Sequence, residues 1–236
     1  MKQLSNRAFK LKVLSDAVVS CQQCPRLVAW RERVGLEKRA AFREESYWAR
    51  PVPGFGDPEA RLVVVGLAPA AHGANRTGRM FTGDRSGDWL YRALYRAGFA
   101  SQPESFSRED GLVLTDAWVT SVVRCAPPVN KPFPEERDHC CRWLDEELDL
   151  LSNARVILCL GSFAYTAIMR RLSQRGFLVP KPRPRFEHGL NIEIENGPLI
   201  ISSYHPSQQN TFTGRLSESM FDSVFAEARF WISRLV

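Results

Sequence analysis

Four short apolar runs alternate along this chain with longer segments of helical periodicity. The apolar runs predict strands at 62–66, within 112–123, at 156–161 and at 199–204. The helical periodicity predicts helices at 88–97, 134–151, 162–172 and from 218 onward. Strands that alternate with helices in this way form a central, mostly parallel sheet with helices on both faces. The pattern therefore predicts an α/β fold, a single-domain three-layer αβα sandwich.

The length of the chain fits one domain over residues 1–236, in which the N-terminal segment 1–60 carries a Cys-x-x-Cys pair. The prolines at 176–186 predict irregular structure there. No apolar run approaches the roughly 20 residues of a membrane span, and residues 1–20 lack the apolar core of a signal peptide. We therefore expect a cytoplasmic protein without a membrane partner.

Polar and glycine-rich sequences follow each of the four predicted strands. These sequences are 66–84, 124–131, 161–162 and 205–207. The carboxyl ends of parallel strands meet at one edge of a sheet, where α/β proteins build their sites. We expect one pocket at this edge, lined by Asn75, Phe81, Asp84, Asn130 and His205.

Basic residues lie in the same loops. We expect the approach to the pocket to be lined by Arg76, Arg79, Arg85, Lys131 and Arg215. The net charge of +6 agrees with a polyanionic partner without requiring one. The other three histidines, His72, His139 and His188, have no comparable sequence context.

Six cysteines in a reducing compartment indicate metal ligation or burial rather than a disulfide framework. Cys21 and Cys24 form a close pair, Cys125 follows a predicted strand, and Cys159 lies inside an apolar run as a core residue. A close pair with two distant cysteines favours a 4Fe-4S cluster over zinc, which usually takes two close pairs. A redox Cys-x-x-Cys pair with scattered core cysteines remains an alternative.

The remaining two cysteines are adjacent in the helix predicted at 134–151. Cys140 lies one turn before Leu144, on the buried stripe of that helix, whereas Cys141 leads to Asp145 on the solvated side. The phase of the helix therefore favours Cys140 as a ligand.

Three sequences together resemble the motifs of one family. They are GLAPAAHGANRTGRMFTGD at 66–84, RCAPPVNKPFP at 124–134 and YHPSQQNTFTGRL at 204–216. They resemble the uracil-DNA glycosylase superfamily, within it the family 5 (type B) enzymes with an iron–sulfur cluster, over nearly the whole chain. The resemblance implies a DNA repair enzyme that flips a deaminated base out of duplex DNA and hydrolyses its N-glycosidic bond. It also implies a 4Fe-4S cluster held by Cys21, Cys24, Cys125 and Cys140.

The resemblance gives roles to four residues. Phe81 would stack on the base, and His205 would donate a hydrogen bond to it as negative charge builds. Asn130 would hold the attacking water, and Asp84 would orient that water or cap the following helix. The alternatives are core packing for Phe81, a capping or core role for His205, and a turn position for Asn130.

Four further positions are predicted to bind substrate: Gly66, Ala68, Asn75 and Ser121. Asn75 contacts the base or only holds its loop. Two of these positions depart from related branches of the superfamily. At the position of Ala68 those branches carry an acid or amide that activates water, and at the position of Ser121 one branch carries an asparagine that reads uracil. Ala68 therefore implies that base departure precedes water capture, and Ser121 implies a broad range that includes uracil, hypoxanthine and other damaged or mispaired bases.

Lys131 is expected to contact a DNA phosphate rather than to form a Schiff base, which predicts a monofunctional enzyme without lyase activity. Phe212 is a candidate wedge between base steps, or an anchor of its loop. The expected partner is double-stranded DNA with a damaged base, and a monomer suffices to act on it. The alternatives are a non-catalytic iron–sulfur protein that binds nucleic acid and, less favoured because G-x-G-x-x-G is missing, a mononucleotide-binding enzyme.

Overall fold

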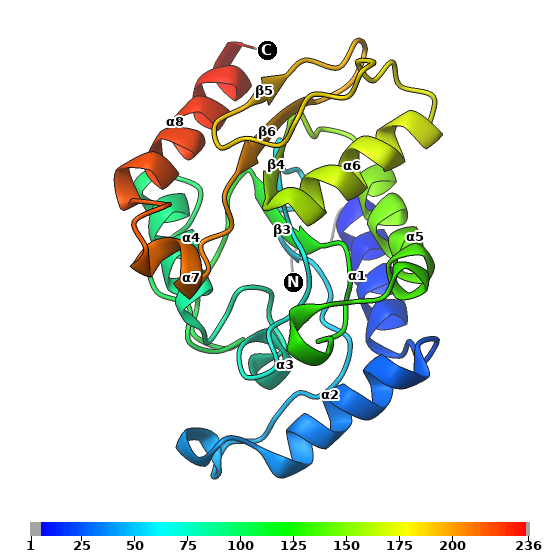
Figure 1. Ribbon diagram of the computed structural model, residues 1–236, viewed down its shortest axis with the longest axis vertical. Helices are drawn as coiled ribbons and strands as arrows, with labels where there is room; N and C mark the ends of the chain where they lie inside the picture. Colours follow the sequence, from blue (N-terminus) through cyan, green and yellow to red (C-terminus); the bar gives the residue numbers. More distant parts are fainter. Residues whose placement is uncertain (1–5, 235–236) are drawn as a thin grey trace.

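The computed structural model describes residues 6–234, and its centre is a twisted sheet. Within the described range the sheet has six strands in the order β1-β3-β2-β4-β6-β5 (Figure 1). Four central strands run parallel: β2 (Leu62–Gly66), β3 (Ala117–Ser121), β4 (Val156–Leu160) and β6 (Leu199–Ser203). Two short antiparallel strands form the edges: β1 (Phe55–Gly56) and β5 (Asn191–Ile192). The predicted α/β class with a mostly parallel sheet is confirmed.

Helices cover both faces of the sheet. The longer ones are α1 (Asn6–Val19), α2 (Pro25–Glu37), α4 (Arg85–Arg96), α5 (Pro134–Leu150), α6 (Ser162–Gln174) and α8 (Glu218–Arg234). The shorter ones are η1 (Ala40–Phe42), α3 (Ala74–Thr77), η2 (Pro128–Asn130) and α7 (Gln208–Phe212). In Figure 1, α1, α5 and α6 lie on one side of the sheet and α4 and α8 on the other. These layers are the predicted three-layer sandwich.

The core consists of two apolar clusters, one on each face of the sheet. Side chains alternate along a strand, so Val63 and Val65 pack with α1, α5 and α6, whereas Leu62 and Val64 pack with α4 and α8. All five residues of each central strand are buried. Burial on both faces is why these strands are continuous apolar runs instead of alternating patterns.

The N-terminal segment is part of this packing. Leu11, Leu14 and Val18 of α1 are buried in the same cluster as α5. The loop with the Cys-x-x-Cys pair then leads into α2, which extends beneath the sheet toward the loop after β2 (Figure 1). In the range 6–234 no helix is both long and apolar enough to traverse a lipid bilayer.

Candidate active site

A cavity of about 790 Å³ opens at the carboxyl edge of the sheet. The loops after β2, β3 and β6 all contribute to its wall, as the strand order predicts. The predicted residues on this wall are Ala68, Phe81, Asp84, Asn130 and His205. The turn after β4 does not line the cavity. It lies behind His205, where a Cβ on Gly161 would be 3.4 Å from the His205 Cβ.

Two rings form one end of this cavity. The Phe81 ring is stacked with the His205 imidazole, with the ring centroids 5.9 Å apart and 30° between their planes. The Phe81 ring also lies directly on the end of β2, because a Cβ on Gly66 would be only 2.6 Å from Phe81 Cζ. Gly66 therefore acts by lacking a side chain, which leaves room for the ring.

His205 leaves β6 two residues after the strand ends and is half-buried. Burial lowers the pKa of its imidazole to about 4, so the ring is neutral near pH 7. The backbone of His205 is held by Asn210, whose Nδ2 donates to the His205 carbonyl at 2.8 Å. A neutral imidazole held in this way can donate one hydrogen bond into the cavity.

Asn130 lies in a tight turn after two prolines. Val129 and Asn130 both have positive φ, 49° and 56°, a conformation that is uncommon for residues other than glycine. The Asn130 N–H donates to the carbonyl of Pro127 at 3.2 Å, which closes the turn. The Asn130 side chain is exposed at the cavity wall, where its amide is free to hold a water molecule.

Asp84 caps helix α4. Its Oδ1 accepts a hydrogen bond from the Gly87 N–H at 3.0 Å, and this cap explains why α4 begins at Arg85, earlier than the predicted start at 88. Burial raises the pKa of the carboxyl group, and the hydrogen bonds from Gly87 and Ser86 partly oppose that rise. The Oδ2 oxygen lies against Gly73 in the cavity wall. The carboxylate thus joins α4 to the glycine-rich loop.

Two predicted substrate-binding residues lie behind the wall instead of on it. Asn75 is fully buried, and its Nδ2 donates to the carbonyls of Arg31 and Ala71 at 3.3 Å each. Ser121 is also buried, and its hydroxyl donates to the Val123 carbonyl at 2.8 Å. In this structure both side chains hold loops in place.

The wall of the cavity also includes a residue that sequence reasoning passed over, His72. Its Nδ1 lies 3.0 Å from the Tyr47 hydroxyl, and the two rings meet edge to face. Burial lowers the pKa of His72, and Arg39 and Arg76 add to this effect. Tyr47 belongs to the irregular segment before β1, so no sequence pattern connects it with the glycine-rich loop.

The predicted basic approach is present only in part. Arg85 lines the cavity mouth, and its guanidinium lies 4.4 Å from the centre of the exposed Phe212 ring. Lys131 and Arg215 are exposed. Arg79 does not line the approach, since its side chain is buried in an ion pair with Asp110. A paired and buried charge of this kind cannot meet a phosphate.

The profile of the Uracil DNA glycosylase superfamily matches residues 53–229 of this chain, which include the whole sheet and all the residues that line the cavity except Arg39 and Phe42. This chain belongs to the uracil-DNA glycosylase superfamily. The family predicted from the three motifs is confirmed.

Several relatives of this glycosylase match nearly its full length. A "Type-5 uracil-DNA glycosylase" of Mycobacterium bovis is 50% identical over 227 residues, which cover 96% of this chain and 83% of that protein. One from Thermus thermophilus is 52% identical, with 91% and 94% coverage. A "Type-4 uracil-DNA glycosylase" of Thermotoga maritima is 29% identical, with 84% and 81% coverage. The chain is accordingly a uracil-DNA glycosylase of DNA repair, most similar among these three to type 5.

The glycosylase has a second, smaller pocket of about 20 Å³ between α2, α5 and the loop after β3. Its wall includes the four predicted ligands, Cys21, Cys24, Cys125 and Cys140. Cys141 lines a different pocket beside α6. It is only 4% exposed, so its predicted position on a solvated side was wrong, because α6 covers that side of α5. Cys159 is a fully buried core residue, as predicted.

Hydrogen-bond donors point at these cysteines. Arg31 is 1% exposed, and its Nη1 donates to Cys125 Sγ at 3.0 Å, while its Nε has no partner among the described residues. The Arg124 N–H donates to Cys140 Sγ at 3.2 Å. Burial raises the pKa of Cys125 to about 11 and that of Cys140 to about 12. The described part of the chain contains no group of three or more His, Cys, Asp or Glu placed to hold a metal ion.

Proposed function

We propose that this uracil-DNA glycosylase extrudes uracil or hypoxanthine from duplex DNA and hydrolyses the N-glycosidic bond without cutting the strand. The observation that carries this proposal is the meeting of Phe81, His205 and Asn130 around one cavity of about 790 Å³. A base inside a duplex hides the bond to be broken, so the nucleotide must leave the stack and enter such a cavity. The partner is double-stranded DNA that carries a damaged base.

His205 and Phe81 would act on the base itself. The Phe81 ring offers a flat apolar face at the end of the cavity. The neutral His205 imidazole donates to a carbonyl oxygen of the base, where negative charge accumulates as the glycosidic bond breaks. A donor that is fixed in advance stabilises the departing base without reorganisation in the transition state.

Asn130 and Asp84 would act on the water side. The Asn130 amide oxygen accepts a hydrogen bond from a water that attacks the anomeric carbon. Ala68 also lines the cavity and brings no carboxylate to activate that water. We therefore propose that the base departs first and that the water then adds, with Asp84 fixing the loop that surrounds it.

We infer a broad substrate range from the cavity wall near Met80, where no side chain from the end of β3 is placed to read the base. Ser121 donates its hydroxyl to Val123 and lies behind Met80, which lines the cavity itself. The end of β3 thus presents no polar side chain that would read the base edge at this position. A pocket of this kind discriminates weakly between deaminated bases, which supports hypoxanthine as a second substrate.

Lys131 supports a monofunctional reaction. Its side chain is exposed and does not line the cavity, so we assign it to a DNA phosphate and not to a Schiff base with the sugar. Phe212 is exposed at the cavity mouth, on the guanidinium of Arg85, where it would enter the base stack as a wedge.

We also assign the four-cysteine pocket to a 4Fe-4S cluster. The buried Arg31 supports this, because its guanidinium has an unsatisfied Nε and donates to Cys125 Sγ, and thiolates bound to a cluster would place negative charge beside it in addition to Glu32. One close pair with two distant cysteines favours a cluster over zinc, which usually takes two close pairs. The cluster, when bound, supplies a covalent connection between α2, α5 and the Asn130 loop, and the residues above carry the reaction.

The decisive experiment uses end-labelled duplexes with one uracil or one hypoxanthine, treated with the purified enzyme and then with or without alkali. We expect cleavage of the strand only after alkali, because an abasic site is alkali-labile. Cleavage without alkali would contradict the monofunctional assignment. His205→Ala should remove the activity, whereas His188→Ala, a second half-buried histidine packed on Tyr204, is the matched control that should keep it. An inert wild type that still binds DNA would support the non-catalytic alternative.

A further inference from the structure

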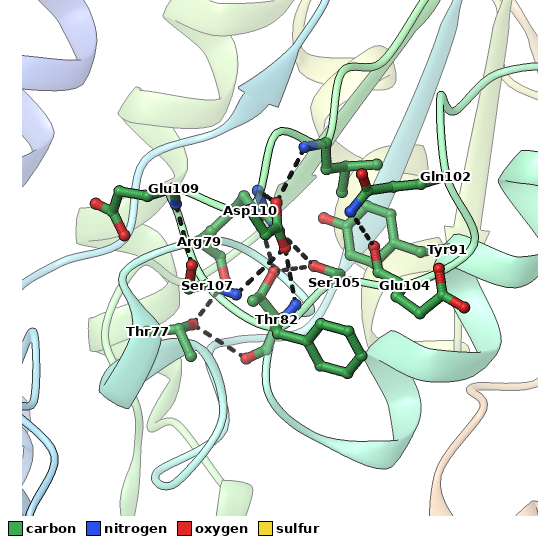
Figure 2. Close-up of polar contacts among 12 residues, drawn as sticks. Thr77, Arg79, Thr82, Tyr91, Gln102, Glu104, Ser105, Ser107, Glu109 and Asp110 are labelled. Carbon is green, nitrogen blue, oxygen red and sulfur yellow. Dashed lines mark hydrogen bonds and ion pairs between the residues drawn. The ribbon is translucent and has the colours of Figure 1, made fainter.

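A buried polar network lies beside the turn that carries Phe81, and Figure 2 shows its members Arg79, Thr82, Ser105 and Asp110. At its centre, Arg79 pairs in two places with Asp110: Nη1 donates to Oδ1 at 2.9 Å and Nη2 donates to Oδ2 at 2.5 Å. The Arg79 and Asp110 side chains are only 4% and 10% exposed. A bidentate pair with this little exposure fixes the direction of the guanidinium as well as its position.

The network continues to both sides of Phe81. Arg79 Nε donates to the Thr82 hydroxyl at 3.0 Å, and that hydroxyl lies 2.6 Å from the Ser105 hydroxyl. The Tyr91 hydroxyl donates to the carbonyl of Met80 at 2.7 Å. The residues immediately before and after Phe81 are therefore each held by a buried hydrogen bond.

These contacts hold Phe81 in an uncommon conformation. Its φ is 53°, in the left-handed region that residues other than glycine seldom occupy. Strain of this kind persists only where the surrounding structure determines the conformation. Gly87 adds to this, because its Cα packs so closely on the Phe81 carbonyl that a Cβ there would collide with it. Only in this conformation does the ring lie on Gly66 beside His205.

Asp110 is itself held by its own loop. Its carboxylate accepts hydrogen bonds from the N–H groups of Phe106 at 2.8 Å, Ser107 at 3.2 Å and Leu112 at 3.0 Å. Residues 105–112 contribute nothing to the wall of the cavity. The loop reaches the site through the ion pair of Asp110 with Arg79 and through Ser105, whose hydroxyl contacts Arg79 and Thr82 and whose carbonyl accepts from the N–H of the cavity-lining Gly83 at 3.4 Å.

We propose that Asp110 is a positioning residue for base recognition: through Arg79 it fixes the Phe81 ring and so sets the affinity of the cavity for the extruded base. This inference rests on the proposed stacking role of Phe81. It goes beyond stabilisation of the fold, because it connects a loop outside the cavity with one side of the base pocket.

The test compares two similar ion pairs. Asp110→Asn keeps an acceptor for the backbone N–H groups and removes the charge that orients Arg79. Asp116→Asn is the control, because Asp116 also forms a two-point ion pair: Arg61 Nε donates to Oδ1 at 3.0 Å and Arg61 Nη2 donates to Oδ2 at 2.7 Å. Asp116 lies directly before β3, at the amino end of that strand, whereas the cavity lies at the carboxyl ends. The readouts are inhibition by free uracil, affinity for a duplex with an abasic site, and the melting temperature.

We expect Asp110→Asn to weaken inhibition by free uracil about tenfold, which corresponds to the loss of one oriented aromatic contact. The affinity for the abasic duplex should stay within about twofold. Both variants should lower the melting temperature, Asp116→Asn by less because Arg61 is 40% exposed, and Asp116→Asn should leave uracil inhibition unchanged. If the two variants behave alike in the uracil assay, the positioning role of Asp110 is wrong.

Two further variants separate the possible failures. If Asp110→Asn does not fold, Ser105→Ala removes the two hydrogen bonds that the Ser105 hydroxyl forms with Arg79 and Thr82, and it should still weaken uracil inhibition, by about threefold. Phe81→Leu tests the assumed stacking role of Phe81. Unchanged uracil inhibition in this variant would overturn that role and with it this proposal. Weaker inhibition in Phe81→Leu together with unchanged inhibition in Asp110→Asn and Ser105→Ala would overturn the positioning role alone.

Discussion

The Phe81 ring and the His205 imidazole lie 5.9 Å apart, although they are separated by more than a hundred residues and follow different strands. Phe81 belongs to the loop after β2, and His205 follows β6. β4 lies between these two strands, and its following turn does not line the cavity. The two rings therefore meet across the middle of the sheet, where a flat base can touch both.

The first prediction concerns His205 as the donor to the departing base. His205→Ala should lower the single-turnover rate on a uracil duplex by about 10²–10³, the cost of one preorganised donor. Affinity for the duplex should change little, because the ring lies inside the cavity and not on the DNA-facing surface. A loss of affinity equal to the loss of rate would show that His205 serves binding in general.

The second prediction is the pH dependence of the same step. With the pKa of His205 lowered to about 4, the imidazole is neutral throughout the range from pH 5.5 to pH 8. The single-turnover rate should therefore vary by less than about twofold over this range. If the charged ring at an ordinary pKa near 6.5 were the donor, the rate would fall about tenfold per pH unit above that value.

The third prediction uses the backbone of Asn130. Asn130→Gly removes the amide and keeps a residue that adopts a φ of 56° without strain. We expect the single-turnover rate to fall about a hundredfold with normal stability, since one water-holding group is lost. Asn130→Ala should show the same rate loss with about 1 kcal/mol less stability, because alanine is strained at this φ. A glycine variant with the wild-type rate would contradict the assignment.

The fourth prediction separates the two roles of Asp84. Asp84→Ser keeps a good N-cap for α4 and removes the second oxygen, which lies against Gly73. We expect a melting temperature close to that of the wild type and a rate at least about tenfold lower on the uracil duplex. A normal rate in Asp84→Ser would leave helix capping as the whole function of this carboxylate. Asp84→Ala should lower both quantities and serves as the comparison.

The fifth prediction compares adjacent cysteines. If the proposed 4Fe-4S cluster is bound, the wild type should be purified brown and with iron, and Cys140→Ala should lose both, because Cys140 lines the pocket with Cys21, Cys24 and Cys125. Cys141→Ala should retain both, since Cys141 lies against α6. Iron content and visible absorption of the two proteins, purified in parallel, decide the matter. Full iron in Cys140→Ala would refute the ligand set.

Much of the fold could be predicted because the central strands are buried on both faces and stand out as apolar runs. The edge strands β1 and β5 have two residues each and carry no such pattern. Helix α4 was predicted to begin too late, because its first turn, Arg85 to Asp88, is polar and only the Asp84 cap marks its true start. The sequence suggested that Asp84 caps this helix, but it left a catalytic role for Asp84 equally open.

The site was predicted where a motif directly follows a strand, as for Phe81 and His205. It was missed where a partner comes from irregular chain. Tyr47 reaches His72 from the segment before β1, and Asp110 neutralises Arg79 from a loop thirty-one positions away. Such pairings depend on tertiary contacts that leave no periodic pattern, which is why Arg79 was wrongly expected to line the approach to the pocket.

Gly66 ends a strand without a side chain because the Phe81 ring lies against it. Any larger residue at this position would push the ring away from His205, so the closed end of the cavity cannot change by stepwise substitution at position 66. If this cavity holds the base as proposed, a change of base preference is more accessible at Ala68, which lines the cavity and is only partly buried. Directed libraries that aim at other lesions should therefore vary that position and leave the glycine alone.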